Sequence, residues 1–242
     1  MSRTLRRALV ATAAAVGLSG SVAGTAFADS TSTSTAVPAA GSGRLVLIQQ
    51  RAKAAIDTRL SALHLAITAV NSNLLIDASD RVTLSGTLNG DIAGLTALGQ
   101  KIQADTTAAQ ARADYQTIFS GYRVFALALP QVRYATACDD ITAGAWPRLT
   151  DAENRLATLL AGPDKSKDSS SVQATMQDLA KQLENITSST SGLSAGVLAL
   201  TPAQWNANHA ILAGPRQTLQ TVRGDVRSAR GDVASVVTAI KS

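Results

Sequence analysis

The sequence predicts an all-α protein: an elongated antiparallel bundle of four or more long heptad-patterned helices, similar to coiled-coil or spectrin-like proteins. From Arg44 onward, apolar residues recur at spacings of three and four, which is typical of helices with one buried face. Short segments rich in glycine, proline or polar residues separate these stretches, so neighbouring helices should run antiparallel. A helix of about 30 residues is about 45 Å long and cannot bury its apolar stripe alone, so we expect the helices to pack side by side.

Residues 1–28 are typical of an export signal. Three arginines precede an apolar stretch at 8–23, and Ala26-Phe27-Ala28 then supplies the small-x-small pattern that signal peptidase cleaves after. The alternative is a membrane anchor that is not cleaved. We favour cleavage because glycines interrupt the stretch, whereas a membrane span needs about 20 strongly apolar residues. No second apolar span follows, so we expect the mature protein to be secreted, either extracellular or associated with the cell wall.

Residues 29–43 (DSTSTSTAVPAAGSG) are rich in serine and threonine and lack apolar periodicity, so we expect a disordered linker. The helical bundle domain should span residues 44–242. It forms either one domain or two halves, 44–161 and 172–242, joined by a loop at 162–171.

Four apolar stripes follow one another along this domain. A turn near Ser79 and Asp80 separates the first two, and Thr201-Pro202-Ala203-Gln204 has the threonine cap, early proline and glutamine of a helix start. The stripes are Leu60, Leu63, Ile67, Val70 and Leu74; Leu84, Leu88, Ile92, Leu95, Leu98 and Ile102; Val172, Met176, Leu179, Leu183, Ile186, Thr190, Leu193, Val197 and Leu200; and Leu219, Val222, Val226, Ala229, Val233, Val236 and Ile240.

The region 106–161 is the most apolar part of the expected mature chain. Pro130 and Pro147 should kink or interrupt its helix. By composition, residues 124–129 are compatible with a buried strand, but their alanines and helical flanks favour a helix. Thr150-Asp-Ala-Glu153 has the pattern of a capping box and should restart a helix.

Charge and cysteine content exclude several classes of function. The chain has 22 basic and 17 acidic residues, a net charge of +5. Cleavage after Ala28 removes three arginines and leaves 19 against 17, so nucleic-acid binding, which needs clustered basic residues, is not expected. Cys138 is the only cysteine, which excludes an intramolecular disulfide, and we interpret it as a small buried apolar residue.

Catalytic and metal motifs are weak. Gly192-Leu-Ser194-Ala-Gly196 matches the nucleophile elbow of hydrolases, but that elbow needs an α/β sheet, and Ser194 lies between stripe residues. Glutamate occurs only at 153 and 184, with no Glu-x-x-His pair for a di-iron site. We interpret Asp139-Asp140 as a solvated pair or helix-end charge, since adjacent helical residues point about 100° apart. No catalytic, cofactor or metal site is expected, and the protein is not expected to be an enzyme.

Two sequence repeats have competing interpretations. Arg223-Gly-Asp225 and Arg230-Gly-Asp232 are RGD triplets, but their seven-residue separation matches the heptad and favours repeated coiled coil over integrin recognition. Gly86, Gly90 and Gly94 indicate either close approach of another helix or a partner, or a weak helix that the fold tolerates.

Two groups of residues are candidates for contact with other molecules. The first consists of Arg216, Arg223, Arg227 and Arg230. Their spacing favours a solvated face with Arg–Asp pairing, and the alternative is a surface that touches anionic wall polymers or lipid headgroups. The second consists of Tyr115, Phe119, Tyr122 and Phe125, which form either core packing or a site for a small apolar ligand.

Three short segments resemble a loose group of secreted helical proteins of high-GC Gram-positive (actinobacterial) bacteria. These segments are Asp91-Ile-Ala-Gly-Leu95, the run Tyr122-Arg-Val-Phe125 with Leu129-Pro130, and Asp139-Asp140. The resemblance implies export and a helical fold, and it implies no particular activity.

We therefore expect a non-catalytic protein of the cell exterior, a structural or interaction module of the cell envelope that packs against another protein or an anionic envelope polymer. The alternative is an extracellular carrier of a small apolar ligand that uses the aromatic-rich region 115–134. A homo-oligomer is left open, because heptads do not specify whether neighbouring helices belong to the same chain.

Overall fold

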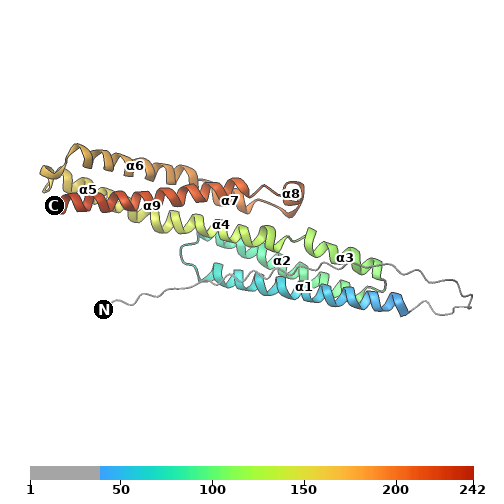
Figure 1. Cartoon of the computed structure of the whole chain (residues 1–242). Helices are drawn as coiled ribbons and strands as arrows, with labels where there is room; N and C mark the ends of the chain where they lie inside the picture. The colour runs from blue at the N-terminus through green and yellow to red at the C-terminus, as the bar shows by residue number, and fades with distance from the viewer. Residues whose placement is uncertain (1–38) are drawn as a thin grey trace, which may run out of the picture. The chain divides into compact units, whose positions relative to one another are not determined.

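Figure 1 shows the computed structural model, which describes residues 39–242. Nearly all of these residues are helical, and none of them lies in a strand, so the all-α prediction is confirmed for the described part of the chain. The export-signal prediction and most of the predicted linker lie outside the described residues. The first helix begins at Ala39, ahead of the expected start at Arg44.

The described chain folds into a series of helices of very different lengths. In order they are α1 (Ala39–Ser72), α2 (Ala78–Ala104), α3 (Ala108–Ser120), the π-helical turn η1 (Val124–Ala128), α4 (Leu129–Asp139), the π-helical turn η2 (Asp140–Ala145), α5 (Trp146–Ala161), the 3₁₀ turn η3 (Lys165–Lys167), α6 (Ser170–Thr190), α7 (Leu193–Leu198), α8 (Pro202–Ala207) and α9 (Ala213–Lys241).

Local sequence explains several of the helix ends. The capping box predicted at Thr201 and Gln204 is present and begins α8. Helix α2 is capped by Asp77, whose carboxylate accepts from the Ser79 N–H, so the helix begins just ahead of Ser79 and Asp80, where the sequence predicted a turn. Helix α6 ends where Gly192 adopts a left-handed conformation with φ of 68°, which glycine tolerates without strain.

Buried apolar residues gather in separate cores along the chain. Helix α1 packs against α2 and α3 around Leu63, Leu88 and Ile118, whereas α6 packs against α9 and α5 around Ile186 and Leu219. A smaller core joins the far ends of α5, α6 and α9. Helix α4 contributes to both of the first two cores, with Ala135 in the core of α1, α2 and α3 and Cys138 in the core of α6 and α9. The two cores therefore adjoin at α4. The loop at 162–171 instead joins α5 to α6, which line the same cores.

The kink or interruption expected at Pro130 and Pro147 is limited to a change from α-helix to a π-helical turn, because the backbone stays helical from Val124 to Ala161. A π-helical turn precedes each proline: Leu129 N–H donates to Val124 O, and Trp146 N–H donates to Ile141 O. Proline lacks the N–H of a normal helical bond and its ring clashes with the carbonyl four residues earlier. The extra residue in each π turn moves that carbonyl away, so the helix accommodates the proline.

The helix restart predicted at Thr150 is wrong, because Thr150 lies inside α5. Its hydroxyl oxygen is buried without a hydrogen-bond partner, as is Nε1 of Trp146 one turn earlier. The true break lies at residues 121–123, between α3 and η1, where Arg123 has a left-handed φ of 47°.

Side chains from neighbouring helices satisfy the carbonyls at several helix ends. Gln131, buried in α4, donates to Val197 O and Leu200 O near the end of α7, at 2.9 and 2.8 Å. Gln49 donates in the same way to carbonyls at the end of α2, and Arg81 donates to carbonyls at the end of α1. Because a helix leaves its last four carbonyls unpaired, these contacts connect helices that apolar packing alone would hold less specifically.

Candidate functional site

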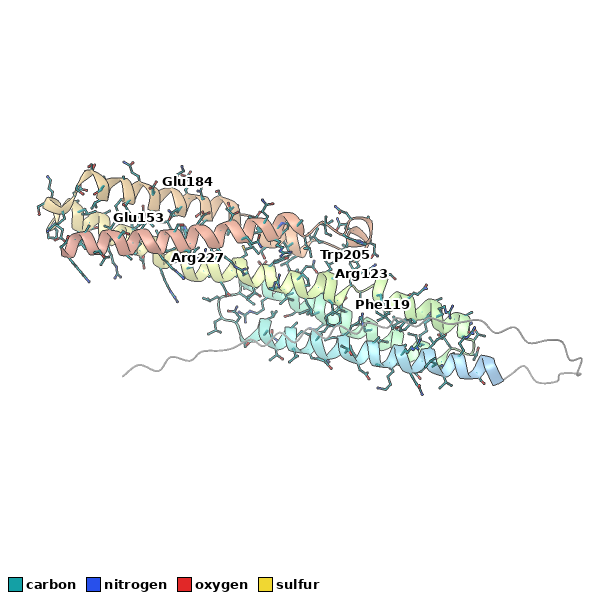
Figure 2. All side chains as sticks on the ribbon, in the orientation of Figure 1. Phe119, Arg123, Glu153, Glu184, Trp205 and Arg227 are labelled. Carbon is teal, nitrogen blue, oxygen red and sulfur yellow. The ribbon has the colours of Figure 1, made fainter. Side chains whose placement is uncertain are left out.

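Helix α9 carries an exposed row of arginines, which we call the arginine flank: Arg216, Arg223, Arg227 and Arg230. All four side chains are exposed. At 100° and 1.5 Å per residue, the four lie within an arc of about 60° and extend over about 21 Å of the helix. Lys241 falls on the same arc in the last turn and is also exposed. Figure 2 shows the side chains of α9, with Arg227 labelled.

The acidic residues of α9 point away from the arginine flank. Asp225 and Asp232 lie about 160–180° around the helix from Arg216. Asp232 accepts a hydrogen bond of 2.8 Å from Gln182 Nε2, which places it against α6. The ion pairs within residues 39–242 are Lys53–Asp57 and Lys101–Asp114, so no arginine of the flank is paired with a carboxylate of the described chain. The Arg–Asp pairing that the sequence favoured for these residues is therefore not found within residues 39–242.

The arginines of α9 and its buried apolar residues lie on different sides of the helix. Its buried residues, among them Leu219, Val222 and Val226, lie between the arginine flank and the acidic side. The flank therefore lies outside the buried side of α9 and is exposed to solvent.

The aromatic residues singled out from the sequence come together around the end of α3. Tyr115, Phe119 and Tyr122 are half-buried and pack against the core of α1, α2 and α3, with the first two rings in edge-to-face contact at 5.1 Å. Gly94 permits the approach of Tyr122, because a Cβ there would lie 2.5 Å from the tyrosine oxygen. These three rings fill space between helices, which favours core packing.

Phe125 differs from the other three rings because its side chain is 49% exposed. The guanidinium of Arg59, on α1, lies over both Phe119 and Phe125, at 4.5 and 5.3 Å from the ring centroids. Partial burial lowers the pKa of Arg59. An arginine that covers aromatic faces in this way stabilises the contact between α1 and the break after α3.

A second stack, which was not predicted from the sequence, holds α8 against the break at residues 121–123. The guanidinium of Arg123 lies 4.5 Å from the centroid of Trp205, and the His209 ring lies 4.1 Å from that centroid. Arg123 Nε donates to Asn206 Oδ1, and Asn206 Nδ2 donates to Ser120 O at 3.0 Å. No residue of α8 is buried, so these polar and stacking contacts hold it in place of a core. Asn206 lies more than 80 positions along the chain from Arg123, and no local sequence pattern predicts contacts over such a separation.

The two adjacent aspartates of the sequence analysis have different surroundings. Asp140 is exposed and accepts from Asn73 Nδ2 at 3.0 Å, whereas Asp139 is only 6% exposed and accepts from the Asp77 N–H at 3.2 Å. Burial raises the pKa of Asp139 to about 6, and neighbouring acids contribute. The expectation of a solvated pair is therefore wrong for Asp139, which joins α4 to the turn between α1 and α2.

Ser194 and Cys138 lie near this turn, but their contacts are structural. The Ser194 hydroxyl donates to the Asp80 carboxylate, so the G-x-S-x-G serine is bonded to an acid and not to a histidine. The Cys138 thiol is buried and is 3.7 Å from Thr190 O, and burial raises its pKa to about 11. Within residues 39–242 no group of three or more histidine, cysteine, aspartate or glutamate side chains is placed to hold a metal ion.

Comparison of the sequence with models of known protein families, with curated proteins and with solved structures gives no match. The likeness to secreted actinobacterial helical proteins therefore stays a prediction. Among the described helices we find none with the length and hydropathy that crossing a membrane requires.

Proposed function

We propose that this chain is an exported, non-catalytic interaction module that binds an anionic polymer of the cell envelope through the arginine flank of α9. The observation that carries the proposal is the exposure of Arg216, Arg223, Arg227 and Arg230 on one side of a helix, without a carboxylate partner in the described chain. Unpaired cations in a row create a positive potential that attracts a polyanion.

The choice of arginine agrees with a polyanionic partner. A guanidinium presents a planar fork of donors that binds phosphate or carboxylate groups in bidentate fashion, whereas lysine acts as a point charge. The flank extends over about 21 Å, enough to contact several repeating anionic groups at once. Each exposed contact is weak on its own, but contacts along one chain reinforce one another.

The finer architecture expected from the sequence belongs to the same proposal. We propose an elongated antiparallel bundle with heptad packing, in which α9 is held by α6 and α5 so that the arginine flank faces outward. The packing of α9 against α6 and α5 supports this arrangement, and so does the contact of Asp232 with Gln182 on the side of α9 away from the flank.

The apolar-ligand carrier that was the alternative has less support at its expected place. Tyr115, Phe119 and Tyr122 pack against the core, which leaves Phe125 as the exposed member of that group. We therefore propose the polymer-binding function first.

The direct test is co-sedimentation with cell walls of the producing organism, at low and high salt, of protein expressed from the full-length gene. We expect binding at 0.05 M salt and loss of most binding at 1 M, where the Debye length falls to about 3 Å. A variant with all four flank arginines changed to Gln should lose binding at low salt as well.

A charge-matched control separates the flank from general basicity. Arg44, Arg51, Arg112 and Lys181 are exposed residues of α1, α3 and α6, and their change to Gln lowers the net charge by the same amount. We expect this control to bind as the unchanged protein does. Equal loss in both variants, or no sedimentation at any salt, would rule out the arginine flank as the binding site.

Export is tested separately by the N-terminus of protein recovered from the culture. Cleavage after Ala26-Phe27-Ala28 predicts a mature chain that begins at Asp29, which mass spectrometry of the intact protein detects. Recovery from the cytoplasm alone, with residues 1–28 retained, would contradict the proposed location.

A further inference from the structure

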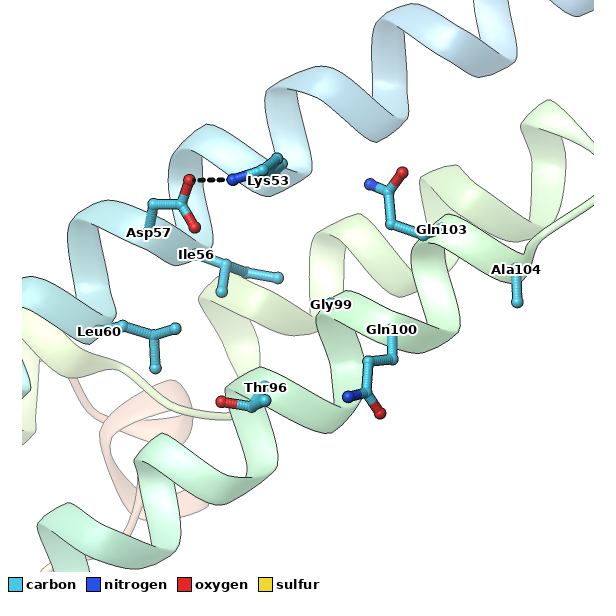
Figure 3. A pocket seen from close by; sticks show the side chains of 9 residues that line it. All are labelled: Lys53, Ile56, Asp57, Leu60, Thr96, Gly99, Gln100, Gln103 and Ala104. Atoms are coloured by element: carbon cyan, nitrogen blue, oxygen red, sulfur yellow. Dashed lines mark hydrogen bonds and ion pairs between the residues drawn. The ribbon is translucent and has the colours of Figure 1, made fainter.

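A groove with an apolar floor follows the contact between α1 and α2, on a part of the molecule that the proposed function does not use. Its volume is about 580 Å³, within the range of small-molecule sites. Figure 3 shows the side chains that line it, which come from residues 53–60 of α1 and 96–104 of α2. Eight residues of helix correspond to about 12 Å, which sets the length of the groove.

The floor of the groove consists of carbon. Ile56 and Leu60 extend from α1 toward Gly99 of α2, which has no side chain. The Ile56 Cδ1 would lie only 3.3 Å from a Cβ at Gly99, so a larger residue there would occupy the floor. The glycine therefore keeps the groove open.

Polar groups lie along the rim and at one end. Lys53 and Asp57 form an ion pair of 2.7 Å on the α1 side, and their side chains are 69% and 56% exposed. Gln103 lies at the same end as Lys53. Its side-chain Nε2 donates to Gln49 O, and its side-chain Oε1 remains available as an acceptor. At the opposite end Leu60 is apolar and the Thr96 hydroxyl donates to Ile92 O of its own helix, so the charged groups of the rim lie toward the Lys53 end.

Charge determines which ligand fits this groove. The ammonium of Lys53 and the carboxylate of Asp57 neutralise each other, so the rim offers donors and acceptors without net charge. A charged headgroup would be attracted to one member of the Lys53–Asp57 pair and repelled by the other. A neutral headgroup with hydroxyl or amide groups can form hydrogen bonds with both side chains. An extended alkyl chain of ten carbons, at about 1.3 Å per carbon, matches the length of the floor.

We infer that the α1–α2 groove binds a neutral single-chain amphiphile, with its alkyl chain on Ile56, Leu60 and Gly99 and its hydrogen-bonding head at Lys53, Asp57 and Gln103. This site is separate from the arginine flank, and it differs from the aromatic region 115–134 considered from the sequence.

The test is isothermal titration calorimetry of the full chain with 1-decanoylglycerol below its critical micelle concentration. Decanoate and decyltrimethylammonium, which have chains of equal length and charged heads, serve as comparison probes. We expect 1-decanoylglycerol to bind at least fivefold more tightly than either charged probe. Failure of 1-decanoylglycerol to bind, or tighter binding of a charged probe, would overturn the inference.

Two glycines of α2 provide a matched pair of variants. Gly99→Leu places a side chain in the floor and should weaken binding at least tenfold. Gly90→Leu is the control, because a Cβ there meets no atom within 4 Å, and binding should stay within twofold of the unchanged protein. Equal affinity of both variants would place the ligand elsewhere.

A second obstructing variant keeps the test decisive if Gly99→Leu disturbs the packing of Ile56. Gln100 is exposed on the rim, so Gln100→Trp covers the groove without entering the core. It should also weaken binding at least tenfold while the circular dichroism spectrum stays unchanged. Undiminished binding in the folded Gln100→Trp variant would contradict the proposed site.

Discussion

Helix α9 and the continuous helical run at 124–161 are both long and both contribute to the cores, yet they differ in where they place polar groups. In α9 the buried residues are aliphatic or alanine, and the arginines all lie on the exposed side. In the run at 124–161, polar groups are buried. Gln131 and Asp139 are 5% and 6% exposed, and Nε1 of Trp146 and the hydroxyl oxygen of Thr150 are buried without a hydrogen-bond partner.

The difference separates two tasks. The run at 124–161 joins the core of α1, α2 and α3 to that of α6 and α9, and its buried Gln131 and Asp139 side chains bond to the ends of other elements. The polar residues of α9 play no such part, apart from Asp232. We therefore expect changes in 124–161 to alter stability, and changes in the arginine flank to alter binding.

The largest effect on stability is expected from Gln131→Leu. The variant removes two hydrogen bonds worth about 0.5–1.5 kcal/mol each and leaves the part-buried Leu200 O without the amide donor, at a further cost of about 1–3 kcal/mol. Val197 O still accepts from the Leu200 N–H, so we expect the free energy of unfolding to fall by about 2–4 kcal/mol. Urea denaturation followed by circular dichroism measures it. Gln220→Leu on the exposed side of α9 is the control and should stay within about 0.5 kcal/mol. A Gln131→Leu variant as stable as this control would break the comparison.

A smaller effect of opposite sign is expected from Asp139→Asn. Burial raises the pKa of Asp139 to about 6 in the folded chain, above the value of about 3.9 of a free aspartate. The ionised carboxylate therefore destabilises the fold above pH 6, and this cost disappears as the pH falls below about 4. Because Asn still offers an oxygen to the Asp77 N–H, the variant should be about 1–3 kcal/mol more stable at pH 7.5 and no more stable at pH 4.

Unfolding free energies of both proteins at several pH values between 4 and 7.5 check this prediction. Burial also raises the pKa of Asp91 to about 6, but Asp91 is present in both proteins, so its contribution cancels in the difference. A difference that grows as the pH falls would show that Asp139 stabilises the fold as an ionised group.

The smallest effect on stability is expected from the change of the four flank arginines to Gln. Their side chains are exposed and unpaired within the described chain, and surface changes of this kind fall on either side of zero, within about 0.5 kcal/mol each. The four changes together should therefore alter the free energy of unfolding by less than about 1 kcal/mol. The same variant should lose binding to cell walls. Destabilisation as large as that of Gln131→Leu would mean that the arginines serve the fold, and the contrast between the two regions would fail.

The two regions were also unequally predictable from the sequence. The aliphatic spacing in α9 identified its buried residues, and the seven-residue repeat of arginines placed them on one exposed side. In the run at 124–161 the prolines suggested a kink or an interruption. The π turns that keep the backbone helical there have no simple signal in a sequence, so they were not predicted. The capping pattern at Thr150 was misleading because it lies within α5, where tertiary packing overrides a local motif.

Partners that lie far apart in the chain could not be predicted. The sequence drew attention to Asp139, but its bond to Asp77 connects residues 62 positions apart. The stack of Arg123, Trp205 and His209 depends in the same way on how α8 returns to the break after α3. Local patterns indicate which side of a helix is buried, whereas these contacts depend on which helices become neighbours.

The central claim is that the arginine flank is the surface in contact with the envelope polymer. Modification with phenylglyoxal, followed by mass spectrometry of the peptides, measures the accessibility of each arginine in free and wall-bound protein. We predict that Arg216, Arg223, Arg227 and Arg230 react in the free protein and are protected when bound, whereas Arg44, Arg51 and Arg112 react equally in both states. Equal reactivity of the flank in free and bound protein would contradict the claim.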